Sequence, residues 1–71
     1  MNWTPDALDR LERAMANGAR VQVRRRGTEM VLVPDRLRHD YGGEVLVALH
    51  LGTGDRVEVP LDDVEWFRVI D

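Results

Sequence analysis

Apolar residues recur along the first part of the chain at the three-to-four-residue spacing of an α-helix. The stripe they form consists of Ala7, Leu8, Leu11, Ala14 and Met15. Charged residues fill the positions between them, as on a helix that packs on one side and meets water on the other. Thr4 and Pro5 suit a helix start and Asn17-Gly18 a helix end, so the pattern predicts one helix over residues 4–17. Such a short helix is marginal alone, and we expect it to pack on the rest of the chain.

The remainder of the chain shows the two-residue alternation of β-strands. Apolar runs separated by glycine, proline or aspartate predict strands near residues 19–26, 28–34, 44–51, 54–60 and 65–70. A single 3₁₀ turn is expected over Leu61–Val64, because an apolar residue stands at each end of it. The polar stretch 35–43 ends in Gly-Gly, and we expect a loop there, anchored by Leu37 and Tyr41.

These elements predict a fold that is mainly β with one N-terminal α-helix. The closing order of strand, tight turn, strand, helical turn and strand is typical of SH3-like and Sm-like barrels. We therefore expect a five-stranded, bent antiparallel sheet or partly open barrel over residues 19–70, in a single domain over residues 1–71. A chain this short buries only about 60% of its unfolded surface, so assembly with further copies would add stability.

The strand at 44–51 is almost continuously apolar, which predicts that both of its faces are covered. To the interior we assign Val45, Val47, Leu49, Leu51, Phe67 and Val69. To the opposite face we assign Leu46, Ala48, Trp66 and Ile70. One helix stripe covers only part of that second face, and uncovered apolar patches mark interfaces. We therefore expect a homo-oligomer, most simply a symmetric dimer.

Three short motifs in this chain resemble segments of a known family. They are Leu46-Val47-Ala48, Leu61-Asp62 with Val64, and Val33-Pro34 with Leu37. In the WYL domain, an Sm-like barrel of bacterial transcription regulators, a W-Y-L-V-A strand is followed by a segment like F-R-L-D-R-I, and a proline and a leucine precede that strand. The resemblance covers roughly residues 21–69 and implies the same barrel, used as a non-enzymatic regulatory module.

The chain departs from the WYL pattern at four positions. Glu44 and Val45 stand where the family has tryptophan and tyrosine. Pro60 and Asp63 stand where it tends to place arginines that bind nucleotide-type ligands. The resemblance therefore implies the barrel without the family's ligand site, and we expect a protein partner or a small anionic ligand.

Charge is spread unevenly, although the net charge is only −3. Residues 20–38 hold six arginines against two acids, and residues 41–71 hold two arginines against seven acids. The candidate binding residues are Arg20, Arg24, Arg26, Arg36 and Arg38. Guanidinium groups suit phosphate geometry, so RNA binding through residues 20–38 is the alternative hypothesis. The competing interpretation is a solvated hairpin whose charges protect it from aggregation. The uridine pockets of Sm-like proteins use asparagine in barrel loops, and here asparagine occurs only at Asn2 and Asn17.

No cluster of residues indicates catalysis. Asp62, Asp63 and Glu65 are acidic neighbours that we interpret as structural, with Asp62 capping the 3₁₀ turn. His39-Asp40 lacks a nucleophile, and His50 is interpreted as a satisfied strand residue. The chain has no cysteine. We expect no enzyme activity, no cofactor, no metal, no signal peptide, no membrane span and a cytoplasmic location.

Overall fold

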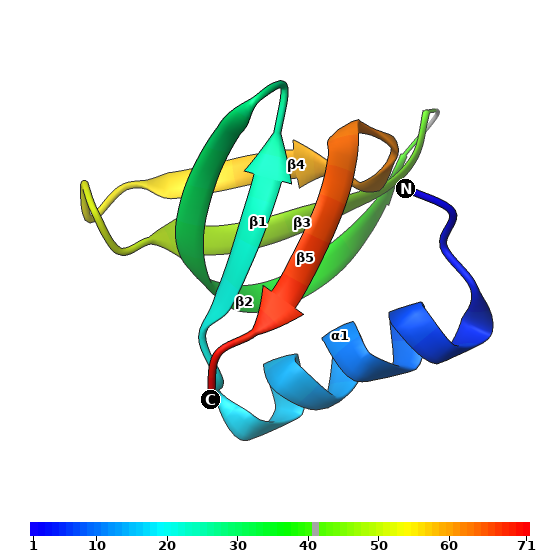
Figure 1. Ribbon diagram of the computed structural model, residues 1–71, viewed down its shortest axis with the longest axis horizontal. Helices are drawn as coiled ribbons and strands as arrows, with labels where there is room; N and C mark the ends of the chain where they lie inside the picture. Colours follow the sequence, from blue (N-terminus) through cyan, green and yellow to red (C-terminus); the bar gives the residue numbers. More distant parts are fainter. Residues whose placement is uncertain (41) are drawn as a thin grey trace.

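The computed structural model describes residues 1–40 and 42–71 (Figure 1). In chain order its elements are α1 (Pro5–Asn17), β1 (Val21–Arg25), β2 (Thr28–Asp40), β3 (Gly43–His50), β4 (Arg56–Pro60), the 3₁₀ turn η1 (Leu61–Asp63) and β5 (Val64–Val69). The strands form one antiparallel sheet in the order β4-β3-β2-β1-β5, which is not closed between β4 and β5. The predicted class, mainly β with an N-terminal helix and a bent open sheet, is confirmed and is compatible with an SH3-like fold.

Strand β2 corrects the loop that the sequence predicts at residues 35–43. It runs for 13 residues, pairs with β1 along its first half and pairs with β3 along its second half. Asp35 is the extra residue of a β-bulge, and bulges bend a strand and tolerate a proline such as Pro34. The loop prediction fails because the polar residues after the bulge form the outer face of a strand. Leu37 pairs with Leu46 and packs against the core, whereas Tyr41 lies outside the described residues.

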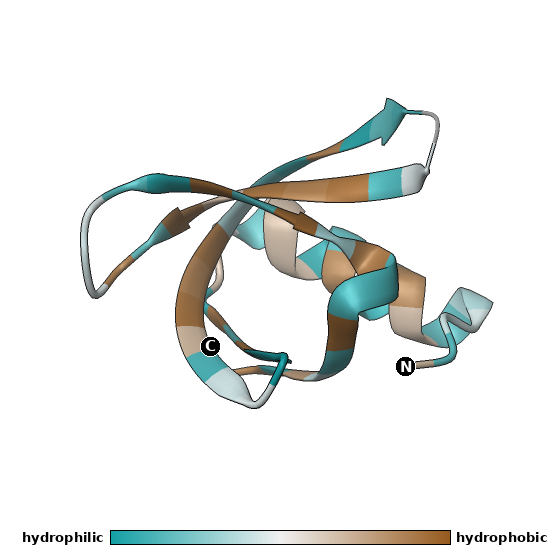
Figure 2. Cartoon of the chain, turned by 90° about the horizontal axis from the view of Figure 1, so that it is seen from above, coloured by the Kyte–Doolittle hydropathy of each residue, from teal (hydrophilic) through white to brown (hydrophobic). Residues whose placement is uncertain are grey.

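Helix α1 lies across one end of the curved sheet and packs its predicted stripe against the core (Figure 1, Figure 2). Thr4 caps it by accepting a hydrogen bond from the Ala7 backbone N–H at 3.1 Å. Gly18 ends it with φ of 64°, a left-handed conformation that glycine adopts without a Cβ clash. Leu11 is 1% exposed, in one cluster with residues from all five strands. The helix is therefore part of the core and not an appendage.

The segment before α1 is fastened to the corner between η1 and β5. The Trp3 ring stacks on Phe67 with centroids 5.3 Å apart, and its Nε1 donates to the Leu61 carbonyl at 2.8 Å. Arg10 places its guanidinium 5.1 Å from the centroid of the same phenyl ring. The Met1 nitrogen donates to the Val64 carbonyl at 3.0 Å. Contacts more than 50 residues apart in sequence thus join the two ends of the chain.

The two faces of β3 are reversed relative to the sequence-based assignment. Leu46 and Ala48 belong to the main core, whereas Leu49 and Leu51 are 43% and 42% exposed. Both sets of alternating residues are apolar, so the pattern alone leaves the phase of the strand open. Pairing with the bulged β2 determines which set faces inward.

The assignment for β5 is correct in three of its four residues. Phe67 is buried in the core, and Trp66 and Ile70 are exposed, as expected. Val69 was assigned to the interior and is instead 38% exposed, beside the C-terminal half of α1. The helix stripe does not extend far enough to cover it.

The outer face of β3 is covered by an ion pair instead of a second layer of structure. Arg38 on β2 is the cross-strand neighbour of Val45, and Glu58 on β4 is that of Val47, so the four side chains share one face. The Arg38 Nη2 donates to Glu58 Oε1 at 2.6 Å, which carries the two side chains across β3. The aliphatic stems of such residues shield apolar surface, and both valines beneath are buried.

We expect Leu11→Ala to lower the free energy of unfolding by about 2–5 kcal/mol, because it leaves a cavity in a fully packed core. Urea denaturation measures the change. The matched control is Glu12→Ala on the exposed face of the same helix, which should shift stability by less than about 0.5 kcal/mol. Equal midpoints for wild type and Leu11→Ala would mean that the helix does not seal the core in solution.

Candidate functional site

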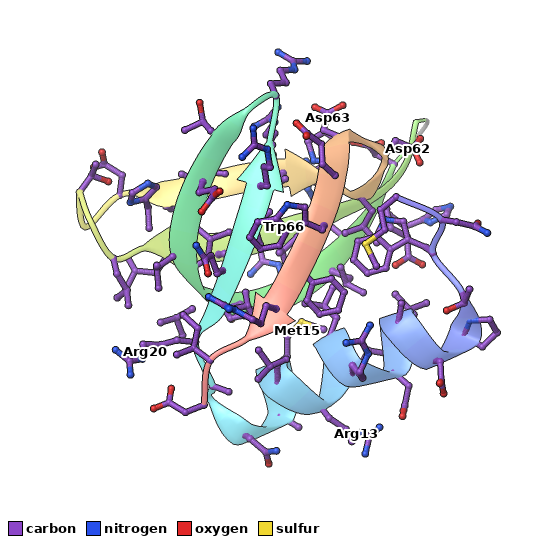
Figure 3. All side chains as sticks on the ribbon, in the orientation of Figure 1. Arg13, Met15, Arg20, Asp62, Asp63 and Trp66 are labelled. Carbon is purple, nitrogen blue, oxygen red and sulfur yellow. The ribbon has the colours of Figure 1, made fainter. Side chains whose placement is uncertain are left out.

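The five candidate arginines do not form a single patch. Arg24 and Arg26 lie at the turn between β1 and β2, and Arg36 and Arg38 lie beyond the bulge of β2. Arg20 precedes β1, at the opposite end of that strand from the β1–β2 turn (Figure 3). The arginines that are close together in the sequence are therefore separated in space. Strand β2 begins at the β1–β2 turn, and its second half carries Arg36 and Arg38 away from that turn.

At the β1–β2 turn, the arginines are held by acids from the end of the chain. Arg24 contacts Glu29 at 3.0 Å and Glu65 at 3.3 Å, and Glu65 also accepts the Gly27 backbone N–H at 2.7 Å. The adjacent Asp63 carboxylate accepts bonds from the next two arginines along the chain, Arg25 and Arg26. The acidic residues that follow β4 thus neutralise this turn and tie it to the η1–β5 corner.

Arg25 also forms an ion pair at this turn, although it is not among the five candidate arginines of the sequence analysis. Its Nη2 lies 3.0 Å from Asp63 Oδ2, and both side chains are less than one third exposed, making this the least exposed of the ion pairs in the described residues. A register shift between Arg24 and Arg25 turns this side chain toward η1. Alternation along a regular strand could not have revealed it.

The arginines beyond the bulge are also paired. Arg36 lies 3.6 Å from the Asp35 carboxylate, and Arg38 bridges Asp40 at 3.3 Å and Glu58 at 2.6 Å. Every candidate arginine therefore has a carboxylate within 4.0 Å. An incoming phosphate would have to share or displace these acids, although exposed pairs of this kind are individually weak.

Arg20 makes a two-bond contact with Asp71, through Nε at 3.2 Å and Nη2 at 3.0 Å. The hydrogen bonds and the charge of Arg20 hold the pKa of the Asp71 carboxyl below its usual value. The same contact raises the pKa of Arg20. The pair continues the alignment of β1 and β5, since Arg20 N–H donates to the Asp71 carbonyl and Ile70 N–H donates to the Arg20 carbonyl.

The remaining titratable candidates have structural roles. His50 Nδ1 accepts the backbone N–H groups of Gly52 and Thr53 and so shapes the β3–β4 turn, in agreement with its interpretation as a satisfied residue. The expected cap of η1 by Asp62 is wrong, because Pro60 occupies the cap position and no side chain bonds there. No group of three or more metal-ligating side chains occurs among residues 1–40 and 42–71.

An apolar depression lies on the outer side of β2, β3 and β4. We call it the outer hollow, a depression of about 340 Å³ lined by Val33, Pro34, Asp35, Val47, Ala48, Leu49 and Arg56. The bulge at Asp35 opens it by separating β2 locally from the regular ladder. Its floor is aliphatic, and Asp35 and Arg56 place one charge of each sign at its rim.

Arg56 differs from the candidate arginines. In the described part of the chain it has no carboxylate within ion-pair distance. It is also exposed, and its cross-strand neighbour is Leu49. Sequence patterns do not single it out, because it is one of two arginines in an acidic region.

The outer hollow continues into an exposed apolar area. Val33 is the cross-strand neighbour of Leu49, and Leu51 donates its backbone N–H to the Val31 carbonyl at 3.0 Å. These four side chains are partly or largely exposed. The sequence predicts an uncovered apolar face that includes Leu46, Ala48, Trp66 and Ile70. Trp66 and Ile70 are exposed, but on β3 the exposed apolar residue is Leu49 in place of Leu46 and Ala48.

A second depression, of about 450 Å³ and more open, lies between α1 and β5. Two arginines line it, and both are engaged: Arg10 over Phe67, and Arg13 with Asp9 at 2.8 Å. It is less enclosed, and both of its arginines on α1 are engaged, so the outer hollow is the better candidate.

No family model, curated protein or solved structure matches this chain. The resemblance to the WYL domain therefore stays a prediction that rests on three short motifs. No helix in the described residues is long and apolar enough to cross a membrane.

Removing Arg20 should return the pKa of the Asp71 carboxyl toward its usual value. In the wild type that pKa is lowered in the folded state, so any stabilisation by the pair is present above the ordinary carboxyl pKa. It is lost as pH falls through the lowered one. An NMR titration of Arg20→Gln measures the change. Arg13→Gln, which loses only its pair with Asp9, should leave Asp71 unaffected.

Proposed function

We propose that this chain is a non-enzymatic binding module that takes a protein partner on its outer hollow. The observation that carries the proposal is the aliphatic depression beside exposed Leu49, with the unpaired Arg56 at its rim. Its volume falls at the lower end of the range typical of ligand pockets, about 300–1,000 Å³. The surface suits an apolar side chain that is followed or preceded by an acidic one.

The shape of the outer hollow favours a protein segment over a small ligand. It is open on one side and merges with the apolar surface of Val31 and Leu51, so a small molecule would stay largely exposed there. An extended segment can place one side chain in the depression and lay its neighbours over the adjoining strand. Anchors of this kind supply most of the affinity of a protein interface.

The resemblance to the WYL domain supports a regulatory role for such a module. The resemblance implies the barrel, but Pro60 and Asp63 stand where the family tends to place arginines. In this chain Asp63 accepts hydrogen bonds from two arginines of the β1–β2 turn. The side chain at this position is thus used within the fold, which favours a binding surface elsewhere.

Nucleic-acid binding through the arginines of residues 20–38 is the alternative. Each candidate arginine already lies beside a carboxylate, and they are spread over three places. Nonspecific RNA binding requires several phosphates to be neutralised together. The pairing therefore favours the protein-binding proposal.

The protein-binding proposal is tested by selecting peptides from a random display library on the wild-type chain. The two variants Leu49→Asp and Ile70→Asp form a matched pair, because both residues are 43% exposed and only Leu49 lines the outer hollow. Selected peptides should bind Ile70→Asp like the wild type. They should bind Leu49→Asp at least about tenfold more weakly, the loss expected for an anchor contact worth over 1 kcal/mol.

Circular dichroism of both variants checks that the fold is retained. Peptides that bind Leu49→Asp as tightly as wild type would place the binding surface elsewhere. The absence of any enriched peptide would count against a peptide-binding module.

Titration with mixed-sequence single-stranded RNA at two salt concentrations tests the alternative. We expect no binding that strengthens steeply at low salt, because the arginines are already neutralised by carboxylates. The double variant Arg24→Glu, Arg26→Glu serves as the control. Steeply salt-dependent binding that this variant loses while remaining folded would instead establish the arginine turn as a nucleic-acid site.

A further inference from the structure

Strand β4 is an edge strand of the sheet, and its free side is suited to pairing with the same strand of a second copy. We propose that β4 pairs antiparallel with β4 of a second copy of the chain, about a two-fold axis at Val57. The proposal goes beyond partner binding at the outer hollow, because it uses the edge of the sheet. It gives the expected homodimer a defined interface.

The edge of β4 is free along its length. Among the described residues β4 pairs with β3 alone, and it stands at the end of the strand order. The other end of the sheet is different, because Met1 bonds to the Val64 carbonyl at the start of β5 and Trp3 covers Phe67. An open edge presents unpaired N–H and C=O groups that favour pairing with another chain.

The hydrogen bonds of the β3–β4 turn determine which groups point outward. His50 N–H donates to the Asp55 carbonyl at 2.8 Å, so Asp55 faces β3. Backbone groups alternate along a strand, so Val57 and Val59 also face β3, whereas Arg56, Glu58 and Pro60 face the free side. Pro60 has no N–H to donate. The usable edge is therefore the pair of residues Arg56 and Glu58.

These two residues are complementary to their own copy in one register. With Val57 on the axis, Arg56 stands opposite Glu58 of the second copy, and Glu58 stands opposite Arg56 of that copy. Each such pair exchanges two backbone hydrogen bonds, since both of its residues face the edge. Both side chains lie on the outer face, so each pair also places a guanidinium beside a carboxylate.

The competing register is worse on two counts. An axis at Glu58 would set two glutamates against each other, and like charges directly opposite are destabilising. It would also place Arg56 opposite Pro60, where the proline cannot donate its half of the hydrogen bonds. Charge and proline together therefore select the register centred on Val57.

The side chains of Arg56 and Glu58 are already available for this pairing. Arg56 has no carboxylate partner within the described residues, and dimerisation supplies one. Glu58 is already oriented by Arg38 and would then lie between two arginines. On the inner face, Val57 is partly exposed against the core, and its two copies would meet on the axis.

Sedimentation equilibrium from micromolar to millimolar concentration tests the proposal. The wild type should be a dimer in this range. Arg56→Glu and Glu58→Arg should each be monomeric, because each sets like charges opposite one another at both pairs. An equimolar mixture of the two variants should form a heterodimer, since every glutamate then faces an arginine.

The double variant Arg56→Glu, Glu58→Arg should dimerise again by the same reasoning. Glu44→Arg makes the same charge change on an exposed residue of β3 and should leave the dimer intact. A wild type that stays monomeric throughout, or a dimer that Glu58→Arg does not dissociate, would overturn the proposal. So would failure of the mixture to associate while both variants remain folded.

Failure of this proposal is distinguishable from failure of the binding function. Glu58 does not line the outer hollow. Monomeric Glu58→Arg leaves Arg56 without the partner copy, so it should bind peptides selected on the hollow at least as tightly as the wild type.

Discussion

The structure depends on the bend in β2. One strand of 13 residues pairs with β1 on one side of the bulge at Asp35 and with β3 on the other, so a single element joins both halves of the sheet. Without the bend the two halves would extend as a flat sheet and would not enclose the core against which α1 packs. The same bulge opens the outer hollow and determines which residues of β3 face the core. Fold, core composition and candidate site thus share one local irregularity.

Sequence patterns predict the elements well where one face is apolar and the other polar. The helix is predicted by its stripe, its threonine cap and its glycine end, and all three act as expected. The 3₁₀ turn and the class of the fold follow from turn residues and short strands. These features are local, so a single segment contains the information for each.

Sequence patterns predict the structure incorrectly where pairing between strands determines it. Residues 35–40 are polar and look like a loop, yet they pair with β3 because the bulge keeps their backbone in register. The strand at 45–48 is apolar on both faces, so alternation could not tell Leu46, in the core, from Val47, beneath an ion pair. The candidate arginines are close in sequence, but their carboxylate partners come from distant strands. Arg56 stands out only when those partners are known.

The contacts of the first four residues with the start of β5 affect how copies of the chain can assemble. Residues 1–4 hold the corner at β5 through a stacked ring and a few hydrogen bonds, without forming a strand of their own. With these contacts in place, the start of β5 is occupied, which disfavours strand pairing there and favours a closed pair through β4. Loss of these contacts would uncover the start of β5 as well. Each copy would then have two unlike edges, and head-to-tail pairing could continue into a ring or an open chain. A few contacts of Trp3 and Met1 would in this way separate a closed assembly from an extended one.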